Sequence, residues 1–432
     1  MIAANLTLLF VFLAVMLLGA PIAIALGLAG FAAIAVGLDA AALQFFAGVT
    51  FSSITKYPLI AIPLFVLTGM IFERSGVAAG LIAFAQSIVG PRRGGLAIVA
   101  ILVCLIMGGM SGSGPADAAA VATSLIPSMK RAGYPPAFSA SVIAAGASAA
   151  ILIPPSLALI IYSVIVPGID LRALFAAGIA PGLLLGFALI TPAWLISRKH
   201  GFGVDEGDVR PPFWQSFRRA IPGLMAPVII LGGLRSGLFT PTEAASAAAA
   251  YGVFVGVFVY RTMGLREIYR SLSDAAEISA VVMFIVGLAG VFAWAGTTLG
   301  AFDQAAQAIL DFTREPMVVL LMMMAILLVA GMLLDGVSVF MITLPLLFPL
   351  AVALNWNLTW FGILMAINVA IGTFTPPMAV NLMVTAKIGN IPLESTFSWV
   401  LWFVFSAVLI LLLLIFFPEI ALWLPRALGY VV

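Results

Sequence analysis

The sequence predicts an all-α polytopic membrane protein with two re-entrant helical hairpins and two broken helices, arranged as an inverted repeat. Three observations lead to this prediction. Of the 432 residues, 64% are hydrophobic and 8% are charged, which is too apolar for a soluble core. Polar, glycine-rich or diproline breaks interrupt apolar stretches in which a helix should continue. The two halves of the chain also carry the same landmarks in the same order.

Apolar segments along the chain supply the expected membrane spans. The first segment lacks a basic flank and runs almost directly into the second, so we interpret it as a retained span and not a cleaved signal. Amphipathic connectors are expected near 76–90 and 301–313. The spans are expected at about 5–18, 21–38, 57–72, 137–166, 171–197, 217–237, 241–260, 275–299, 358–390 and 397–424.

The stretch GGMSGSGPAD, Gly108–Asp117, is a helix breaker between two apolar segments, 94–107 and 118–129. Each segment is shorter than the about 20 residues of helix that cross a hydrocarbon core. A hairpin over 94–129 that enters the membrane and returns is therefore expected. Bare backbone at that depth requires burial by protein or a wet cavity. The tip of this hairpin is accordingly interpreted as a site.

A second hairpin, 317–352, follows from an internal repeat. An ungapped shift of 222 residues carries Gly109 to Gly331 and the diproline Pro154-Pro155 to Pro376-Pro377, with both hairpin tips aligned. The first repeat is expected to cover 1–210, with its broken helix at 137–166. The second is expected to cover 211–432, with its broken helix at 358–390.

Basic residues predict the orientation, because loops rich in Lys and Arg stay cytoplasmic. With the Arg92-Arg93 loop inside, threading the spans leaves 14 of the 19 basic residues cytoplasmic, together with the loop 198–219. Both termini are then periplasmic, and the hairpins enter from opposite faces. Such inverted repeats are typical of secondary transporters, whose sites lie where discontinuous helices meet near the midplane. The five outer basic residues are Lys56, Arg172, Arg235, Arg314 and Arg426.

The breaks offer oxygen atoms suited to a cation. Pro154 and Pro155 lack an N–H and free carbonyls about one turn earlier, near Ala150. Hydroxyls and carbonyls suit a hard cation such as sodium, whereas helix N-termini suit an anionic group. One cage in each repeat gives two or more sodium ions and no other metal. The first sodium site is predicted from Ser111, Gly112, Ser113, Gly114, Ala150, Pro154 and Pro155, the second from Asp335, Gly336, Ser338, Gly372, Thr375, Pro376 and Pro377, and the substrate contacts from Ser113, Asp117, Ser156, Thr373 and Asn381.

Several of these residues also have simpler interpretations. Asp117 and Asp335 each either cap a helix or contact a ligand, since an acid in a first turn is stabilising anyway. Glu243 follows Thr240 by three residues, which is the capping-box pattern. Outer basic residues such as Arg235 either anchor the chain at the interface or meet an anionic substrate.

Composition argues against other classes of function. Cys104 is the single cysteine, which excludes an intrachain disulfide. His200 is the single histidine and is expected in a polar loop, which argues against a histidine metal cluster or a Ser-His-Asp triad. Ser111 and Ser113 lack a clean G-x-S-x-G context and a base within the membrane. No basic run with interleaved aromatic residues suggests nucleic-acid binding, and no organic cofactor is expected.

Longer motifs resemble a known family over essentially the whole chain. They are GGMSGSGPADAAAVATSLIPSMKRAGYPPAFSASVIAAG, IPPSLALIIYSVI, LFTPTEAASAAAAYG, GMLLDGVSVFMITLPLLFPL and INVAIGTFTPPMAVNLMV. These stretches look like the large membrane (M) subunit of tripartite ATP-independent periplasmic (TRAP) transporters. The resemblance implies that the family's sodium-site regions correspond to the Ser111–Gly114 tip with the first diproline, and to the Asp335–Ser338 tip with Thr375 and the second diproline. Where the family leads us to expect a glycine before the first diproline, this chain has Ala149–Ile153.

The resemblance implies a function and a set of partners. It implies sodium-driven import of an organic anion, such as a C4-dicarboxylate, a sialic acid or another sugar acid. The anion would be delivered by a separate periplasmic substrate-binding (P) protein, and a small four-helix membrane (Q) subunit would be a separate chain in the bacterial inner membrane. The family resembles elevator transporters, in which hairpins and broken helices move against a scaffold of the other helices. Two rivals stay open: a stand-alone sodium/dicarboxylate symporter of the same broad superfamily, and an intramembrane enzyme.

Overall fold

The computed structural model describes residues 2–38, 40–203 and 210–432, and these residues form helices and connecting turns without a strand. Part of the expected cytoplasmic loop, 204–209, lies outside the described residues. The α-helices are α1 (Ile2–Leu17), α2 (Ile22–Gly37), α3 (Phe45–Ile54), α4 (Ala61–Arg74), α5 (Val77–Val89), α6 (Gly95–Ser111), α7 (Gly114–Arg131), α8 (Pro136–Ser148), α9 (Leu157–Ile165), α10 (Leu171–His200), α11 (Phe213–Ser236), α12 (Pro241–Phe254), α13 (Leu265–Thr298), α14 (Ala301–Phe312), α15 (Pro316–Leu333), α16 (Gly336–Ala353), α17 (Leu358–Gly372), α18 (Val380–Gly389), α19 (Phe397–Phe416) and α20 (Glu419–Ala427). Short 3-10 helices are η1 (Ala40–Gln44), η2 (Tyr57–Ile60), η3 (Ala149–Ile151) and η5 (Leu393–Thr396), and η4 (Val255–Val259) is a π-helical segment.

Many of these helices are long and apolar enough to cross a bilayer. Within the described ranges, eight helical segments meet that requirement by length and composition, among them α10, α11, α13 and α19. α1 and α2 are shorter, at 16 residues each. The chain is therefore a multi-pass membrane protein.

The two hairpins are present, but their arms are longer than the sequence suggested. α6 has 17 residues and α7 has 18, and only Gly112 and Ser113 separate them. The expectation of short arms at 94–107 and 118–129 was wrong. At 1.5 Å per residue each arm is roughly 26 Å long. The helix continues because Gly108 to Ser111 keep helical hydrogen bonding, and Pro115 suits the first turn of α7.

The second hairpin has the same plan. α15 and α16 have 18 residues each, and both are long and apolar enough to span a bilayer on their own. Leu334 and Asp335 alone separate them.

Both broken helices also form as expected. The first consists of α8, the turn η3 and α9, with Pro154-Pro155 in the break. The second consists of α17 and α18, with Pro376-Pro377 in the break. Both Pro–Pro peptide bonds are cis.

Helix boundaries in the two halves correspond at the shift of 222 residues. It carries the end of α6 at Ser111 to the end of α15 at Leu333. It carries both ends of α7 (Gly114–Arg131) to both ends of α16 (Gly336–Ala353). It also carries the start of α8 to the start of α17.

Two helices differ from the expected spans. α3 lies between the expected spans 21–38 and 57–72, where no helix was expected, and it packs along α13. The expected span 397–424 is divided into α19 and α20. Pro418 accounts for the division, because proline disfavours helical geometry in the residue before it and cannot donate the next hydrogen bond.

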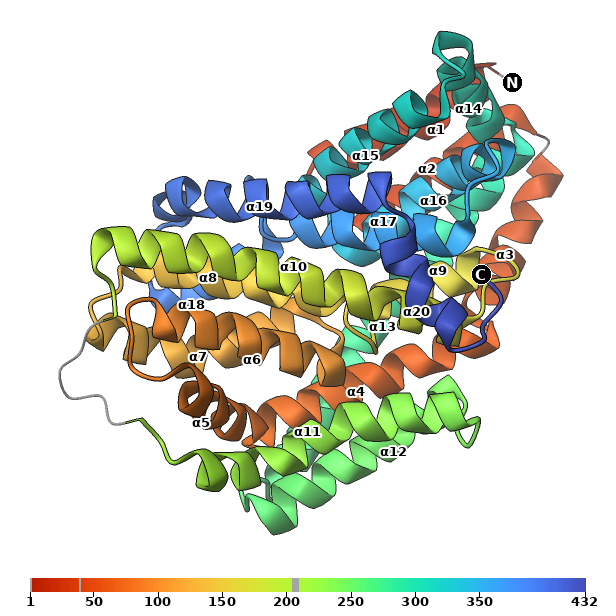
Figure 1. Ribbon diagram of the computed structural model, residues 1–432. Coiled ribbons are helices and arrows are strands. Elements are labelled where there is room, and N and C mark those ends of the chain that lie inside the picture. The colour runs from red at the N-terminus through yellow and green to blue at the C-terminus, as the bar shows by residue number, and fades with distance from the viewer. Residues whose placement is uncertain (1, 39, 204–209) are drawn as a thin grey trace.

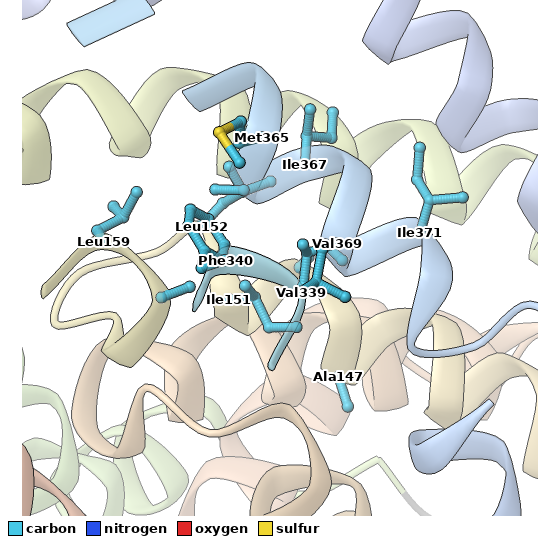
Figure 2. Close-up of a cluster of buried hydrophobic side chains, with 14 of the residues drawn as sticks. Ala147, Ile151, Leu152, Leu159, Val339, Phe340, Met365, Ile367, Val369 and Ile371 are labelled. Carbon is cyan, nitrogen blue, oxygen red and sulfur yellow. The ribbon is translucent and has the colours of Figure 1, made fainter. Parts of the chain in front are cut away.

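A buried apolar cluster joins the two halves. Figure 2 shows Ile151, Leu152 and Leu159 from the first broken helix lying near Val339 and Phe340 of α16. The same close-up shows side chains of α17 beside them, and Tyr162 of α9 donates a hydrogen bond to the Leu358 carbonyl, 2.5 Å away, at the start of α17. The first broken helix and the second hairpin therefore share one core.

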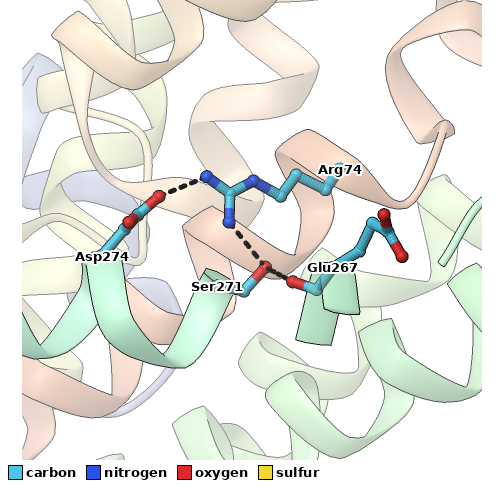
Figure 3. A network of polar contacts seen from close by, with 4 residues as sticks. All are labelled: Arg74, Glu267, Ser271 and Asp274. Carbon is cyan, nitrogen blue, oxygen red and sulfur yellow. Dashed lines mark hydrogen bonds and ion pairs between the residues drawn. The ribbon is translucent and has the colours of Figure 1, made fainter. Parts of the chain in front are cut away.

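A polar network fastens α4 to α13. The Arg74 guanidinium forms an ion pair with Asp274 and donates a 3.4 Å hydrogen bond to the Ser271 hydroxyl (Figure 3). Ser271 in turn donates to the Glu267 backbone carbonyl, 2.9 Å away. This network holds one end of α4 in place, and the same helix reaches the first hairpin tip.

Candidate functional site

The tip of the first hairpin is a tight turn pressed against the first break. Gly112 has φ +60, a left-handed conformation that favours glycine, and its N–H donates to the Gly108 carbonyl at 3.1 Å. A Cβ built on Gly112 would overlap the Pro155 carbonyl oxygen and lie 3.3 Å from the Ser156 Cα. Glycine at this position therefore permits the tip to reach the diproline.

Ser111 and Asp117 form a buried pair beneath this turn. The Ser111 hydroxyl donates to one Asp117 carboxylate oxygen at 2.7 Å, and the Ser113 backbone N–H donates to the Ser111 hydroxyl at 3.2 Å. Asp117 is 1% exposed, and its second carboxylate oxygen has no hydrogen-bond partner among the described residues. The Asp117 carboxylate accepts no hydrogen bond from the backbone at the start of α7 in the described part of the chain. Its partner there is the Ser111 side chain, so the capping interpretation of Asp117 lacks support.

α4 completes the surroundings of this tip. A Cβ built on Gly69 would lie 3.2 Å from the Ser111 Cβ, so the two backbones approach closely. Gly69 belongs to none of the predicted site residues, and its only signal in the sequence is a glycine within an otherwise apolar span.

The first break supplies a second wall. Gly108 lies directly against Ala150, because a Cβ on Gly108 would be 2.6 Å from the Ala150 Cα. Ser156 is the N-cap of α9, since its hydroxyl accepts a 3.4 Å bond from the Leu159 N–H, and it also donates to the Ile151 carbonyl. A substrate contact from Ser156 stays a prediction.

The second tip is built on a capping aspartate. Asp335 is the N-cap of α16, and its carboxylate accepts from the Ser338 N–H at 3.3 Å and from the Ser338 hydroxyl at 2.6 Å. Ser338 is completely buried. The capping interpretation of Asp335 is thus confirmed, and a ligand role in addition stays a prediction. Glu243 likewise completes a capping box with Thr240.

Contacts between α15 and α17 hold the second tip against the second break. A Cβ on Gly372 would lie 2.6 Å from the Gly331 Cα, so these helices cross at two glycines. The Met378 N–H donates to the Met332 carbonyl at 3.2 Å. A Cβ on Gly336 would lie 2.9 Å from a Val369 methyl.

Hydroxyls line the second break, and most bond to the backbone. Thr373 donates to the Ala370 carbonyl at 2.7 Å, and Thr375 donates to the Ile371 carbonyl at 2.6 Å. Each hydroxyl oxygen keeps acceptor capacity after donating its proton. Such an oxygen can serve a cation as a ligand.

Asn381 brings the two repeats together. Its side-chain amide donates to the Thr373 hydroxyl at 3.2 Å and to the Ala144 carbonyl of α8 at 3.4 Å. A Cβ on Gly114 of the first tip would lie 3.0 Å from the same amide nitrogen. The Asn381 carbonyl oxygen is buried and has no partner in the described part of the chain. The second break and the first tip therefore meet at this residue.

A second asparagine has a similar environment. The Asn368 side-chain amide donates to the Met324 carbonyl at 2.8 Å, which links α17 to α15. Its own carbonyl oxygen also lacks a partner within the described ranges. The predicted site residues thus form two clusters, one at each tip and break, with Asn381 between them.

These features define a polytopic helical membrane protein. Two solved transport proteins share the fold at low identity. The YdaH transporter of Alcanivorax borkumensis has a TM-score of 0.54 and 15% identity, with 90% of each chain covered. MtrF of Neisseria gonorrhoeae has a TM-score of 0.60 and 14% identity, with 88% of this chain and 86% of that chain covered.

The family is shown by sequence. The family model for the tripartite ATP-independent periplasmic transporter, DctM component, matches residues 9–420. The chain belongs to this family: it is a large permease subunit of a TRAP transporter and not an enzyme.

Its relatives carry different substrate names. The C4-dicarboxylate TRAP transporter large permease protein DctM of Pseudomonas aeruginosa is 38% identical, with 88% of each chain covered. The DctM protein of Rhodobacter capsulatus is 33% identical, over 96% of this chain and 98% of the relative. The sialic acid TRAP transporter permease protein SiaT of Haemophilus influenzae is 34% identical, over 87% of this chain and 61% of that longer protein.

Proposed function

We propose that this subunit imports an organic anion, coupled to sodium, after delivery by a periplasmic substrate-binding protein. The substrate class is supported by the names of the relatives, which specify C4-dicarboxylate and sialic acid. The observation that carries the proposal is the junction at Asn381, where the first tip meets the second break. Buried polar groups from two discontinuous helices converge there, as substrate and ion sites do in secondary transporters.

Two sodium sites are proposed, one in each cluster. The first uses the Ser111–Gly114 tip and the carbonyls around Ala150 and Pro155. The second uses Asp335, Ser338 and the Gly372–Pro377 break. Both clusters are rich in hydroxyl, carboxylate and carbonyl oxygens, which hard cations prefer. The unpartnered oxygens of Asp117 and Asn381 are available to an ion or to a donor on the substrate.

An elevator movement of an inverted repeat is proposed as the mechanism. The corresponding helix boundaries of the two halves support the repeat. The contacts in Figure 2 join the first broken helix to α16 and α17, which supports movement of these elements together. In this proposal α1, α2, α4 and α11–α13 belong to the scaffold.

The partners and the location follow from the family. We propose a separate small membrane subunit and a periplasmic binding protein, with the complex in the bacterial inner membrane. Both termini are proposed to be periplasmic, supported by the distribution of the basic residues.

Charge at the second tip provides the sharpest test. The variant Asp335→Asn keeps an N-cap, because asparagine caps as well as aspartate, but it removes the negative charge. The matched control is Asp170→Asn, at the N-cap of α10, where Asp170 accepts from the Arg172 N–H at 2.8 Å and is exposed. Sodium-driven uptake into proteoliposomes, with the partner proteins added, should fall at least tenfold in Asp335→Asn and stay normal in Asp170→Asn. Normal sodium-dependent uptake in both variants would refute a sodium site at this tip.

The partner requirement separates this proposal from its rival. Uptake should require both the binding protein and the small subunit. Sodium-driven uptake by this chain alone would instead identify a stand-alone symporter. Turnover of a substrate without its movement across the membrane would indicate an enzyme.

A further inference from the structure

A groove runs along the outer face of the molecule between α10 and α19, two helices that lie side by side in Figure 1. Its volume is about 410 Å³. One end lies at Lys199, His200 and Trp399, and the other lies at Thr191 and Leu409. The two helices are antiparallel, since residue numbers rise along α10 toward the end where α19 begins. From Thr191 to Lys199 the groove is about 12 Å long, at 1.5 Å of rise per residue.

The walls of the groove are apolar and exposed. Leu195, Trp402 and Phe405 are 52%, 59% and 61% exposed on helices that are apolar enough to span a bilayer. On such helices an exposed apolar side chain faces lipid or another membrane helix. The Ser406 hydroxyl in the wall is already used, because it donates to the Ala188 carbonyl at 2.8 Å.

One end of the groove is basic, in contrast to its walls. Lys199 and His200 occupy the last turn of α10. The His200 ring is fixed by a 3.0 Å contact of Nδ1 with the Ile196 carbonyl and by stacking on Phe202 at 5.3 Å. The edge of Trp399 lies against it at 5.5 Å. Among the described residues, no hydrogen bond is formed by the other ring nitrogen of His200.

We propose that this groove binds an anionic phospholipid. One acyl chain lies along the wall formed by Leu195, Trp402 and Phe405, and the phosphate of the headgroup contacts Lys199 and His200. Basic pockets between membrane helices on the cytoplasmic side recognise acidic headgroups in this way, and tryptophan is enriched at the same depth. The inference does not depend on the transported substrate or on sodium.

A helix of a partner subunit fits the groove less well. Helices that pack tightly in membranes present small residues, which allow the backbones to approach. Here the rim is formed by large side chains, Trp402 and Phe405 among them. A helix laid over the groove would also cover the Lys199 ammonium, and it would have to supply a negative charge at that position.

Native mass spectrometry of the purified protein tests the proposal, with phosphatidylglycerol and phosphatidylcholine added separately. Phosphatidylglycerol should bind more tightly than phosphatidylcholine. Lys199→Gln should weaken phosphatidylglycerol binding about fivefold, because one basic residue near a membrane surface contributes about 1 kcal/mol of attraction. The control Arg270→Gln, an exposed basic residue on α13, removes the same charge away from the groove and should leave binding unchanged.

A second variant tests the acyl-chain wall. Thr191→Phe, at an exposed position on α10, narrows the far end of the groove and should reduce the binding of both lipids. Equal effects of Lys199→Gln and Arg270→Gln would overturn the proposal, since they would indicate attraction to net charge alone. A photo-crosslinking benzoylphenylalanine can also be placed at Phe405 in membranes that contain the complex. Capture of the small subunit and of no lipid would overturn the proposal.

Discussion

Replacing Gly112 by alanine, compared with a matched control, distinguishes two costs at the first tip: the steric clash with the diproline and the unfavourable backbone conformation. Gly112 has φ +60, and a non-glycine residue there costs about 1–2 kcal/mol. The new methyl group would in addition overlap the Pro155 carbonyl oxygen. Forcing an extra methyl group into a packed contact costs about 1–3 kcal/mol more. Either the tip or the break has to move, and both belong to the proposed first sodium site.

Gly133 provides the matched control. It has φ +78, it lies just after the same hairpin, and a Cβ built there meets nothing within 4 Å. Gly133→Ala therefore shares the backbone cost of Gly112→Ala without the clash. Because a 1.4 kcal/mol loss is a factor of ten in affinity, we expect the sodium concentration for half-maximal uptake to rise on the order of tenfold in Gly112→Ala only.

Uptake into proteoliposomes at varied sodium concentration measures this effect. Thermal unfolding in detergent measures the stability that both variants lose through the backbone conformation. Both variants should lose similar stability from the backbone, with Gly112→Ala losing more. Equal sodium dependence in the two variants would show that the contact between the tip and Pro155 does not shape a cation site.

Three further predictions concern the packing around the site. Gly372→Ala should lower the free energy of unfolding by about 1–3 kcal/mol, because its Cβ would lie 2.6 Å from the Gly331 Cα. Gly331→Ala should be nearly neutral by the same thermal assay, because its nearest contact would be an ordinary 3.4 Å; similar losses in both would contradict this packing. Asn381→Ala should lower the free energy of unfolding by about 1–3 kcal/mol in thermal unfolding, because buried polar groups lose their hydrogen-bond partner. The same variant should abolish uptake, and normal uptake would argue against the junction. A double-mutant cycle of Arg74→Gln and Asp274→Asn should give a coupling energy below about 1 kcal/mol, because both side chains are partly exposed (28% and 45%), and a larger value would count against that reasoning.

Much of the fold could be predicted from the sequence, because membrane helices follow apolar length and breaks follow glycine and proline. The hairpins, the broken helices and both amphipathic connectors are present near their expected positions. The extent of the first breaker was overestimated, since Gly108–Ser111 and Gly114–Asp117 are helical. Glycine lowers helix propensity without forbidding a helix, and burial against neighbouring segments such as η3 outweighs that weak preference.

Roles at the site were less predictable, because they depend on contacts between distant segments. Asp117 and Asp335 look alike in sequence, as acids beside glycine-rich tips. In the structure Asp335 caps α16, whereas Asp117 holds the Ser111 side chain. Only the three-dimensional packing places Gly69 against Ser111.

Asn381 links the two clusters. Its backbone N–H donates to the Thr373 carbonyl at 2.9 Å, so the residue is fixed to the second break. Its side chain reaches Ala144 of α8 and lies against Gly114 of the first tip. A displacement of the second break would therefore strain these contacts unless the first hairpin and α8 moved with it. The two proposed sodium sites thus belong to one mechanical unit, and that is the property an elevator movement needs if ions and substrate are to cross together.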